Sequence, residues 1–157
     1  MYASDVTGPM SGLPDPVREP EFYRGVPMRR FVAWLIDLVI VIAIGVPLAL
    51  VFGVFTLGFG FALFPAIVTA IAFAYRTLTL ANGSATWGMK FCGIEFRRGD
   101  GSRFDLPTAG LHTLIQTVAF TFFVLQMISC ATILATRYGQ SLPDLILGTT
   151  ALHRPVD

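Results

Sequence analysis

The chain has 157 residues and a formal net charge of +1; 54% of its residues are hydrophobic and 13% are charged. Its mean hydropathy is +0.68. Soluble domains carry about a quarter charged residues to cover their surface, so this composition argues against a soluble globular protein. The sequence also lacks a basic stripe interleaved with aromatic residues, so nucleic acid is not an expected partner.

Residues 1–28 form a polar segment that we expect to be a mobile cytoplasmic tail. A secretory signal peptide would place its apolar region within about the first 15–30 residues. Here the same region is polar and is interrupted by Pro9, Pro14, Pro16, Pro20 and Pro27. The apolar sequence begins only at Phe31 and is long enough to remain in the membrane.

The chain from Leu38 to Tyr75 contains no Asp, Glu, Lys or Arg. A bilayer core about 30 Å thick needs about 20 apolar residues in a helix, so this run and its flanks predict spans over 30–52 and 61–79. The turn residues between them are Gly53, Thr56, Gly58 and Gly60. Arginines before the first span favour a cytoplasmic amino terminus; they are Arg24, Arg29 and Arg30.

The segment 80–105 differs from the spans because it is positively charged, which again favours the cytoplasmic side. Its charges are Lys90, Arg97, Arg98 and Arg103. Its short apolar pattern ends at Asp100-Gly101, a dipeptide typical of a turn. We expect an extended or amphipathic piece that lies at the membrane interface.

A second stretch without Asp, Glu, Lys or Arg runs from Leu106 to Thr136. It predicts a third span over 114–135, although the same stretch also fits a bent or re-entrant hairpin. Three full spans place the carboxyl terminus outside, and a hairpin returns it inside. The predicted fold is an all-α membrane protein with about three transmembrane helices and an interfacial segment between the second and third. Its membrane domain covers 29–152, followed by a polar end over 153–157.

Asp37 is the most informative single residue because it lies inside the first predicted span. An acid at a helix centre costs roughly 2.5–3.5 kcal/mol to insert, so it needs a polar partner or a wet cavity. Arg30, Trp34 and Asp37 share one helix face, but two turns separate Arg30 from Asp37. Each is therefore expected to meet a group from another segment. The functional interpretation is a proton or cation site, and the structural one is an ion pair that fixes helix packing.

Asp144 is the second acid that lies within an apolar stretch. One interpretation is that it pairs with Arg30 or Arg76. The other is that it stands in the first turn of a short helix beside Pro143, where the helix dipole favours negative charge. The sequence leaves both interpretations open.

Other reactive side chains show no pattern that predicts a catalytic, metal or nucleotide site. Cys92 and Cys130, like His112 and His153, lack the spacing of metal ligands. The stretch 83–90 resembles a phosphate-binding loop only in part, because its Gly and Lys are not adjacent and no hydroxyl residue follows. We expect no cofactor, no metal and no enzyme activity.

Three short motifs follow one another at 30–37, 86–94 and 140–149. The first opens with Arg and ends with Asp, the second reads Thr-x-Gly-x-Lys-x-x-Gly, and the third has a central Asp. In this order they resemble the RDD family of integral membrane proteins, over about residues 27–152. The resemblance implies the site residues Arg30, Asp37 and Asp144 and the motif residues Thr86, Gly88, Lys90 and Gly93. The chain departs from the family pattern at Pro143, where His is usual, and at Glu95, where a basic or polar residue is common.

The resemblance implies a multi-pass protein of a bacterial-type inner membrane, and it leaves two functions open. One is a non-catalytic accessory, assembly or scaffold component of a larger membrane complex, for which the Gly and Ala content suits helix contacts. The other is transport of a cation, proton or small solute through an oligomer, with Asp37 taking up the ion. The expected partners are the lipid bilayer and either another membrane protein or further copies of the chain.

Overall fold

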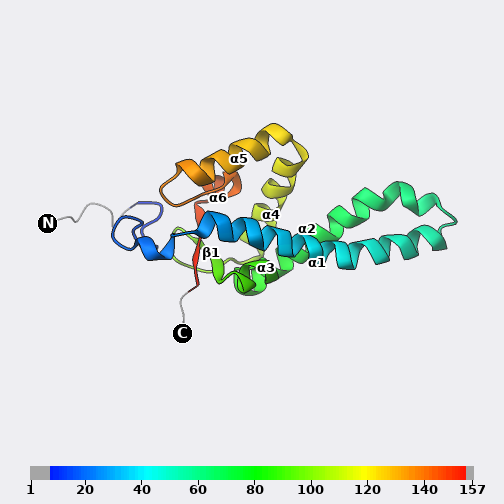
Figure 1. The fold of residues 1–157 in the computed structure, drawn as a ribbon, viewed down its shortest axis with the longest axis horizontal. Coiled ribbons are helices and arrows are strands. Elements are labelled where there is room, and N and C mark those ends of the chain that lie inside the picture. Colours follow the sequence, from blue (N-terminus) through cyan, green and yellow to red (C-terminus); the bar gives the residue numbers. More distant parts are fainter. Residues whose placement is uncertain (1–7, 155–157) are drawn as a thin grey trace.

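The computed structural model describes residues 8–154, and most of these residues are helical (Figure 1). The elements in chain order are η1 Pro20–Phe22, α1 Val26–Phe55, η2 Phe59–Leu63, α2 Phe64–Gly83, α3 Trp87–Phe91, β1 Ile94–Arg98, α4 Leu106–Thr121, α5 Phe123–Ala135, α6 Leu142–Leu147 and β2 Thr149–His153. The expected all-α membrane architecture is confirmed, with one addition: β1 and β2 form a small sheet.

The helices α1 and α2 form a long hairpin whose far half extends beyond every other element (Figure 1). Both helices are long and apolar enough to cross a membrane. α1 has 30 residues, which corresponds to about 45 Å at 1.5 Å per residue. On α1 every fourth residue from Ala33 to Gly53 is buried, mostly a small one, and this stripe faces α2 and α3. α1 extends past the predicted span of 30–52 at both ends, whereas α2 begins three residues after the start of the predicted span of 61–79 and ends four residues after it. The first residues of that second span belong to η2.

The third apolar stretch is folded into two helices, α4 and α5, which meet at Phe122 with a bend of 119°. Phe122 is extended, with φ −107° and ψ 105°, so it ends one helix and begins the next. Residues 8–154 therefore contain two helices that are long and apolar enough to cross a membrane, or three if the bent pair counts as one span. A straight helix over 114–135 is not formed, and the bent alternative describes this stretch. Neither Pro nor Gly marks the bend in the sequence.

The segment between α2 and α4 forms a compact unit with the end of the chain. α3 leads into β1, which pairs antiparallel with β2 so that Ile94 lies opposite His153 and Arg98 lies opposite Thr149. The expected turn at Asp100-Gly101 is present, and Gly101 adopts φ +82°. The sheet was not expected, because the strand partner of 94–98 lies about fifty residues later in the chain.

The buried core lies where this unit meets the near ends of α1, α2 and α4. Its largest fully buried side chains are Phe96, Leu80 and Ile94, each at most 1% exposed. The described part of the amino-terminal tail is tied to the turn after β1, because the Gly12 N–H donates to the Gly99 carbonyl. Within the tail, the Tyr23 hydroxyl donates to the Pro14 carbonyl. The expected tail residues 1–7 and end residues 155–157 lie outside the described part.

Candidate functional site

Asp37 accepts hydrogen bonds from three neutral donors on two other elements. The Tyr75 hydroxyl of α2 donates to Oδ1 at 2.7 Å, and the Gly88 N–H of α3 donates to the same oxygen at 2.9 Å. The Thr86 hydroxyl donates to Oδ2 at 2.6 Å. The side chain is only 7% exposed, so these donors replace the water that a carboxylate at this depth would otherwise need.

The Thr-x-Gly part of the second motif is built around this carboxylate. Thr86 caps α3, because its hydroxyl oxygen accepts the Met89 N–H while the hydroxyl hydrogen goes to Asp37. A methyl group on Gly88 would collide with the carbonyl oxygen of Ala33 and lie 2.9 Å from Asp37 Oδ1. Glycine is therefore needed for α3 to approach the backbone of α1 and deliver its N–H.

The rest of the motif ends α3. Gly93 adopts φ +67°, a conformation that favours glycine, and its N–H closes the helix on the Lys90 carbonyl. Arg29 of α1 donates to the Cys92 carbonyl at 2.6 Å, which ties the end of α3 back to α1. Lys90 lies in the last turn of α3, where positive charge is favoured by the helix dipole, and its side chain is exposed.

Arg30 and Asp144 form a buried ion pair between α1 and α6. An Nη atom of Arg30 lies 2.7 Å from Asp144 Oδ2, and their side chains are 12% and 0% exposed. The same Nη atom donates to the Ser141 hydroxyl and the other to the Gly139 carbonyl. The guanidinium carbon also lies 5.2 Å from the centre of the Phe96 ring, a distance at which a cation is attracted to an aromatic face.

Asp144 is also held by groups from α4, α6 and β2. It forms a capping box with Ser141 at the start of α6, and its Oδ1 accepts the Thr149 hydroxyl at 3.0 Å. Burial raises the pKa of the Asp144 carboxyl, but the Arg30 guanidinium and the bonds from His112 and Ser141 outweigh it, so this pKa lies below its ordinary value. Asp144 is therefore both an acid in the first turn of a short helix and the partner of Arg30.

His112 of α4 completes the surroundings of Asp144, with Nε2 at 2.7 Å from Oδ1. A carboxylate only accepts, so Nε2 carries the hydrogen and donates it. The ring is fully buried against Phe96 and Phe104, and its Nδ1 has no hydrogen-bond partner within the described part of the chain. A histidine therefore does stand beside Asp144, although it comes from α4 and not from position 143, which Pro143 occupies in the first turn of α6.

The structure brings the predicted residues together as two separate networks. Within the described residues, no ion pair closer than 4 Å joins Asp37 to an arginine. Sequence reasoning missed Tyr75 and His112 as partners, because nothing local in the sequence links either residue to an acid. Glu95, noted as a departure from the family pattern, is buried and pairs with Arg97 and Arg154. Its charge is thus compensated locally, within the sheet and the end of the chain.

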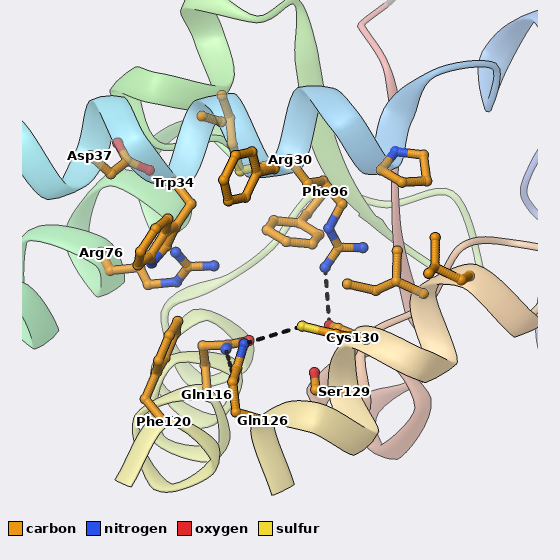
Figure 2. Close-up of a pocket in the computed structure, with 17 residues that line it drawn as sticks. Arg30, Trp34, Asp37, Arg76, Phe96, Gln116, Phe120, Gln126, Ser129 and Cys130 are labelled. Carbon is orange, nitrogen blue, oxygen red and sulfur yellow. Dashed lines mark hydrogen bonds between the residues drawn. The ribbon is translucent and has the colours of Figure 1, made fainter. Parts of the chain in front are cut away.

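A cavity of about 470 Å³ lies between α1, α2, α4 and α5 and is lined by Arg30, Asp37 and Arg76 (Figure 2). Figure 2 shows the guanidinium groups of Arg30 and Arg76 directed into it from different helices. Gln116 and Gln126 lie on its opposite wall. Among residues 8–154, no group of three His, Cys, Asp or Glu side chains has an arrangement that could hold a metal ion.

Comparison with known families gives one match, to a model described as RDD family, which covers residues 24–148. The matched region begins just before α1 and ends after α6, so it includes the cavity and, apart from Thr149, both acid networks. Searches of curated proteins and of solved structures found no match.

Proposed function

The chain belongs to the RDD family, and from this premise we propose that it is a non-catalytic accessory, assembly or scaffold component of a larger membrane complex. The proposal rests on the observation that the carboxylates of both acids are already engaged in hydrogen bonds or an ion pair within the chain. Asp37 is held by three neutral donors and Asp144 by Arg30, His112, Ser141 and Thr149. Groups engaged in this way fix the packing of helices, which is the work of an architectural site.

The membrane faces of the hairpin support the same function. Only 22% of the most apolar stretch of the first spanning helix is buried within the chain, and 6% of that of the second. Val39 on α1 is 66% exposed, whereas Ala49 on the same helix is fully buried. Surface of this kind is available to lipid and to helices of other membrane proteins, where close packing drives association.

The proposal includes a bacterial-type inner membrane and a cytoplasmic amino terminus. Its support is the distribution of charge: Arg24, Arg29 and Arg30 lie at the start of α1, and four further cations lie between α2 and α4. Both clusters sit at the same end of the hairpin (Figure 1), which is the arrangement the positive-inside rule requires. Labelling of single introduced cysteines from either side of intact cells tests this orientation.

The test of the accessory role is isolation of the full chain from its native membrane in a mild detergent. We expect a second membrane protein in a fixed stoichiometric ratio. A photo-crosslinking residue at position 39, in place of the exposed Val39, is expected to capture that protein, and the same residue in place of the buried Ala49 is the matched control. A particle that contains only copies of this chain would contradict the proposal.

Ion transport is the second candidate function, and one observation favours it. Asp37 lines both the cavity of Figure 2 and a neighbouring cavity of about 380 Å³, so its carboxylate is not sealed from small ions. In proteoliposomes, transport predicts proton movement driven by a cation gradient that is lost with Asp37→Asn and retained with Asp105→Asn, an exposed acid. Equal flux from wild type and Asp37→Asn would remove Asp37 from such a mechanism.

A further inference from the structure

Arg76 is the charged residue of α2, and it belongs to neither acid network. No hydrogen bond or ion pair within 4 Å reaches its guanidinium from the rest of the described chain, and its Nε is buried without a partner. An arginine at membrane depth costs several kcal/mol, on the order of 2.5–3.5 at a helix centre, and normally has an anion or carbonyl beside it. Its free donors point to an acceptor that the chain itself does not supply.

The guanidinium stands at the junction of two cavities. Trp34, Asp37, Arg76, Gln116 and Phe120 line both the cavity of about 470 Å³ and that of about 380 Å³. The rings of Trp34 and Phe120 stack with centroids 6.1 Å apart and form the wall between them. Each volume falls in the range of about 300–1,000 Å³ that is typical of small-molecule sites.

Gln116 and Ser129 are two further polar residues of the larger cavity, and their hydrogen bonds leave donors available to an acceptor. The Gln116 amide donates to Gln126 over a long 3.4 Å. The Ser129 hydroxyl oxygen accepts the Leu142 N–H at 3.1 Å, which leaves its own hydrogen free to donate. Asp37 does not form a contact ion pair with Arg76, because the carboxylate oxygens of Asp37 already accept hydrogen bonds from Tyr75, Thr86 and Gly88.

The rim of the same cavity is apolar and lies exposed on the surface of the described chain. Phe31 is 55% exposed, Phe120 is 45% exposed and Leu134 is 80% exposed. A cationic floor below an exposed apolar rim fits a molecule that has an anionic head and an apolar tail. A free inorganic anion would leave the rim unused, and a lipid without a phosphate would leave Arg76 without its acceptor.

We propose that this cavity binds an anionic phospholipid, whose phosphate accepts hydrogen bonds from Arg76 and whose acyl chain lies over Phe31 and Phe120. The site is built on Arg76, which belongs to neither acid network, and the proposal goes beyond the accessory role. The guanidinium donors of Arg76 match the geometry of phosphate oxygens. Phosphatidylcholine also carries a phosphate, but its cationic choline group would lie close to the positive charge of Arg76, so a headgroup of net negative charge is preferred.

The test uses fluorescence quenching in the full chain. The chain has two tryptophans, so Trp87→Phe leaves Trp34, which lines the cavity, as the only indole. Phosphatidylglycerol with brominated acyl chains is titrated into the protein in a neutral detergent, and brominated phosphatidylcholine is titrated in parallel. We expect saturable quenching with about tenfold higher apparent affinity for phosphatidylglycerol, because its headgroup lacks the cationic choline that Arg76 would repel. Equal affinities for the two lipids would overturn the proposal. Both lipids are titrated into the same protein, so this comparison does not depend on whether an arginine variant folds.

Two variants in the same background locate the selectivity. Arg76→Gln is expected to remove most of the preference for phosphatidylglycerol. Arg103→Gln removes one exposed positive charge outside the cavity and is expected to leave the preference unchanged. Full selectivity in Arg76→Gln, or an equal loss in both variants, would overturn the site. Relief of the quenching by millimolar inorganic phosphate would assign the cavity to a free anion instead of a lipid.

Discussion

Asp37 and Asp144 are the same residue type within one small domain, yet the structure holds them in opposite ways. Asp37 lies in the first spanning helix and is surrounded by uncharged donors from α2 and α3. Asp144 lies in a short helix outside the spans and is paired with Arg30, with His112 on its other oxygen. The Asp37 network packs α2 and α3 against α1 around a carboxylate. The Asp144 network connects the beginning of the family-matched region to its end.

The difference predicts different consequences of mutation. Removal of one member of a buried ion pair leaves the other charge without compensation, whereas removal of an acceptor from neutral donors leaves only weak polar groups unpaired. The Asp144 network should therefore dominate stability and the Asp37 network should dominate local geometry. Four measurements test this contrast, each by unfolding of detergent-solubilised protein with dodecyl sulfate, followed by tryptophan fluorescence.

The largest effect is expected for Arg30→Ala, which leaves Asp144 buried and unpaired. We expect the free energy of unfolding to fall by about 3–5 kcal/mol. Arg98→Ala is the matched control, because its partner Asp105 is 3.2 Å away and the two side chains are 41% and 53% exposed. Such an exposed pair contributes less than about 1 kcal/mol. Similar losses in the two variants would show that burial does not set the strength of the Arg30 pair.

Gly88→Ala is expected to lower the free energy of unfolding by about 1–3 kcal/mol, as for overpacking. The added methyl group collides with the Ala33 carbonyl, so α3 must move away from Asp37. Gly83→Ala is the control, because the nearest atoms to its added methyl group belong to the flexible Lys90 side chain at 3.4 Å. Since alanine favours the helix, that variant should be neutral or up to about 1 kcal/mol more stable. If both substitutions lowered the free energy of unfolding, the cause would be a general sensitivity of α2 and α3 to substitution and not the collision at Gly88.

The pH dependence of stability should distinguish Asp144 from the other acids. Its pKa in the folded protein lies below the unfolded value, so its contribution is fully present above the unfolded pKa of about 3.9 and is lost as the pH falls below it. We expect a loss of up to about 1.4 kcal/mol per pH unit below pH 4. The slope should be smaller in Asp144→Asn, and parallel profiles for the two proteins would contradict the assignment.

Asp37→Asn should have the smallest effect, about 1 kcal/mol. Asparagine keeps one acceptor for the donors of Tyr75 and Gly88, and it removes a charge that is costly at membrane depth. Tyr75→Phe, which deletes one of the donors, should cost a similar amount. A loss as large as that of Arg30→Ala would mean that Asp37 acts as an ionic partner, with Arg76 as the available cation.

The sequence singled out charged residues and offered Arg30 or Arg76 as the partner of Asp144, but it could not choose between the two or name the donors to Asp37. Charges within apolar stretches are conspicuous, so Arg30, Asp37 and Asp144 were identified directly, and the spacing on one helix ruled out a direct bond between the first two. The partners were missed because they are distant in the chain: His112 is 32 residues from Asp144, and Tyr75 is 38 residues from Asp37. A propensity or motif carries no information about contacts at such separations.

By itself, the sequence determined that two segments are long and apolar enough to cross a membrane and which charged residues lie within apolar stretches, because hydrophobicity and charge are local properties of each segment. Only the tertiary structure decided which donor meets which acid, that the third apolar stretch bends at Phe122, and that Arg76 faces a cavity without a partner among residues 8–154. These features depend on how helices pack against one another, and packing is set by all the segments together.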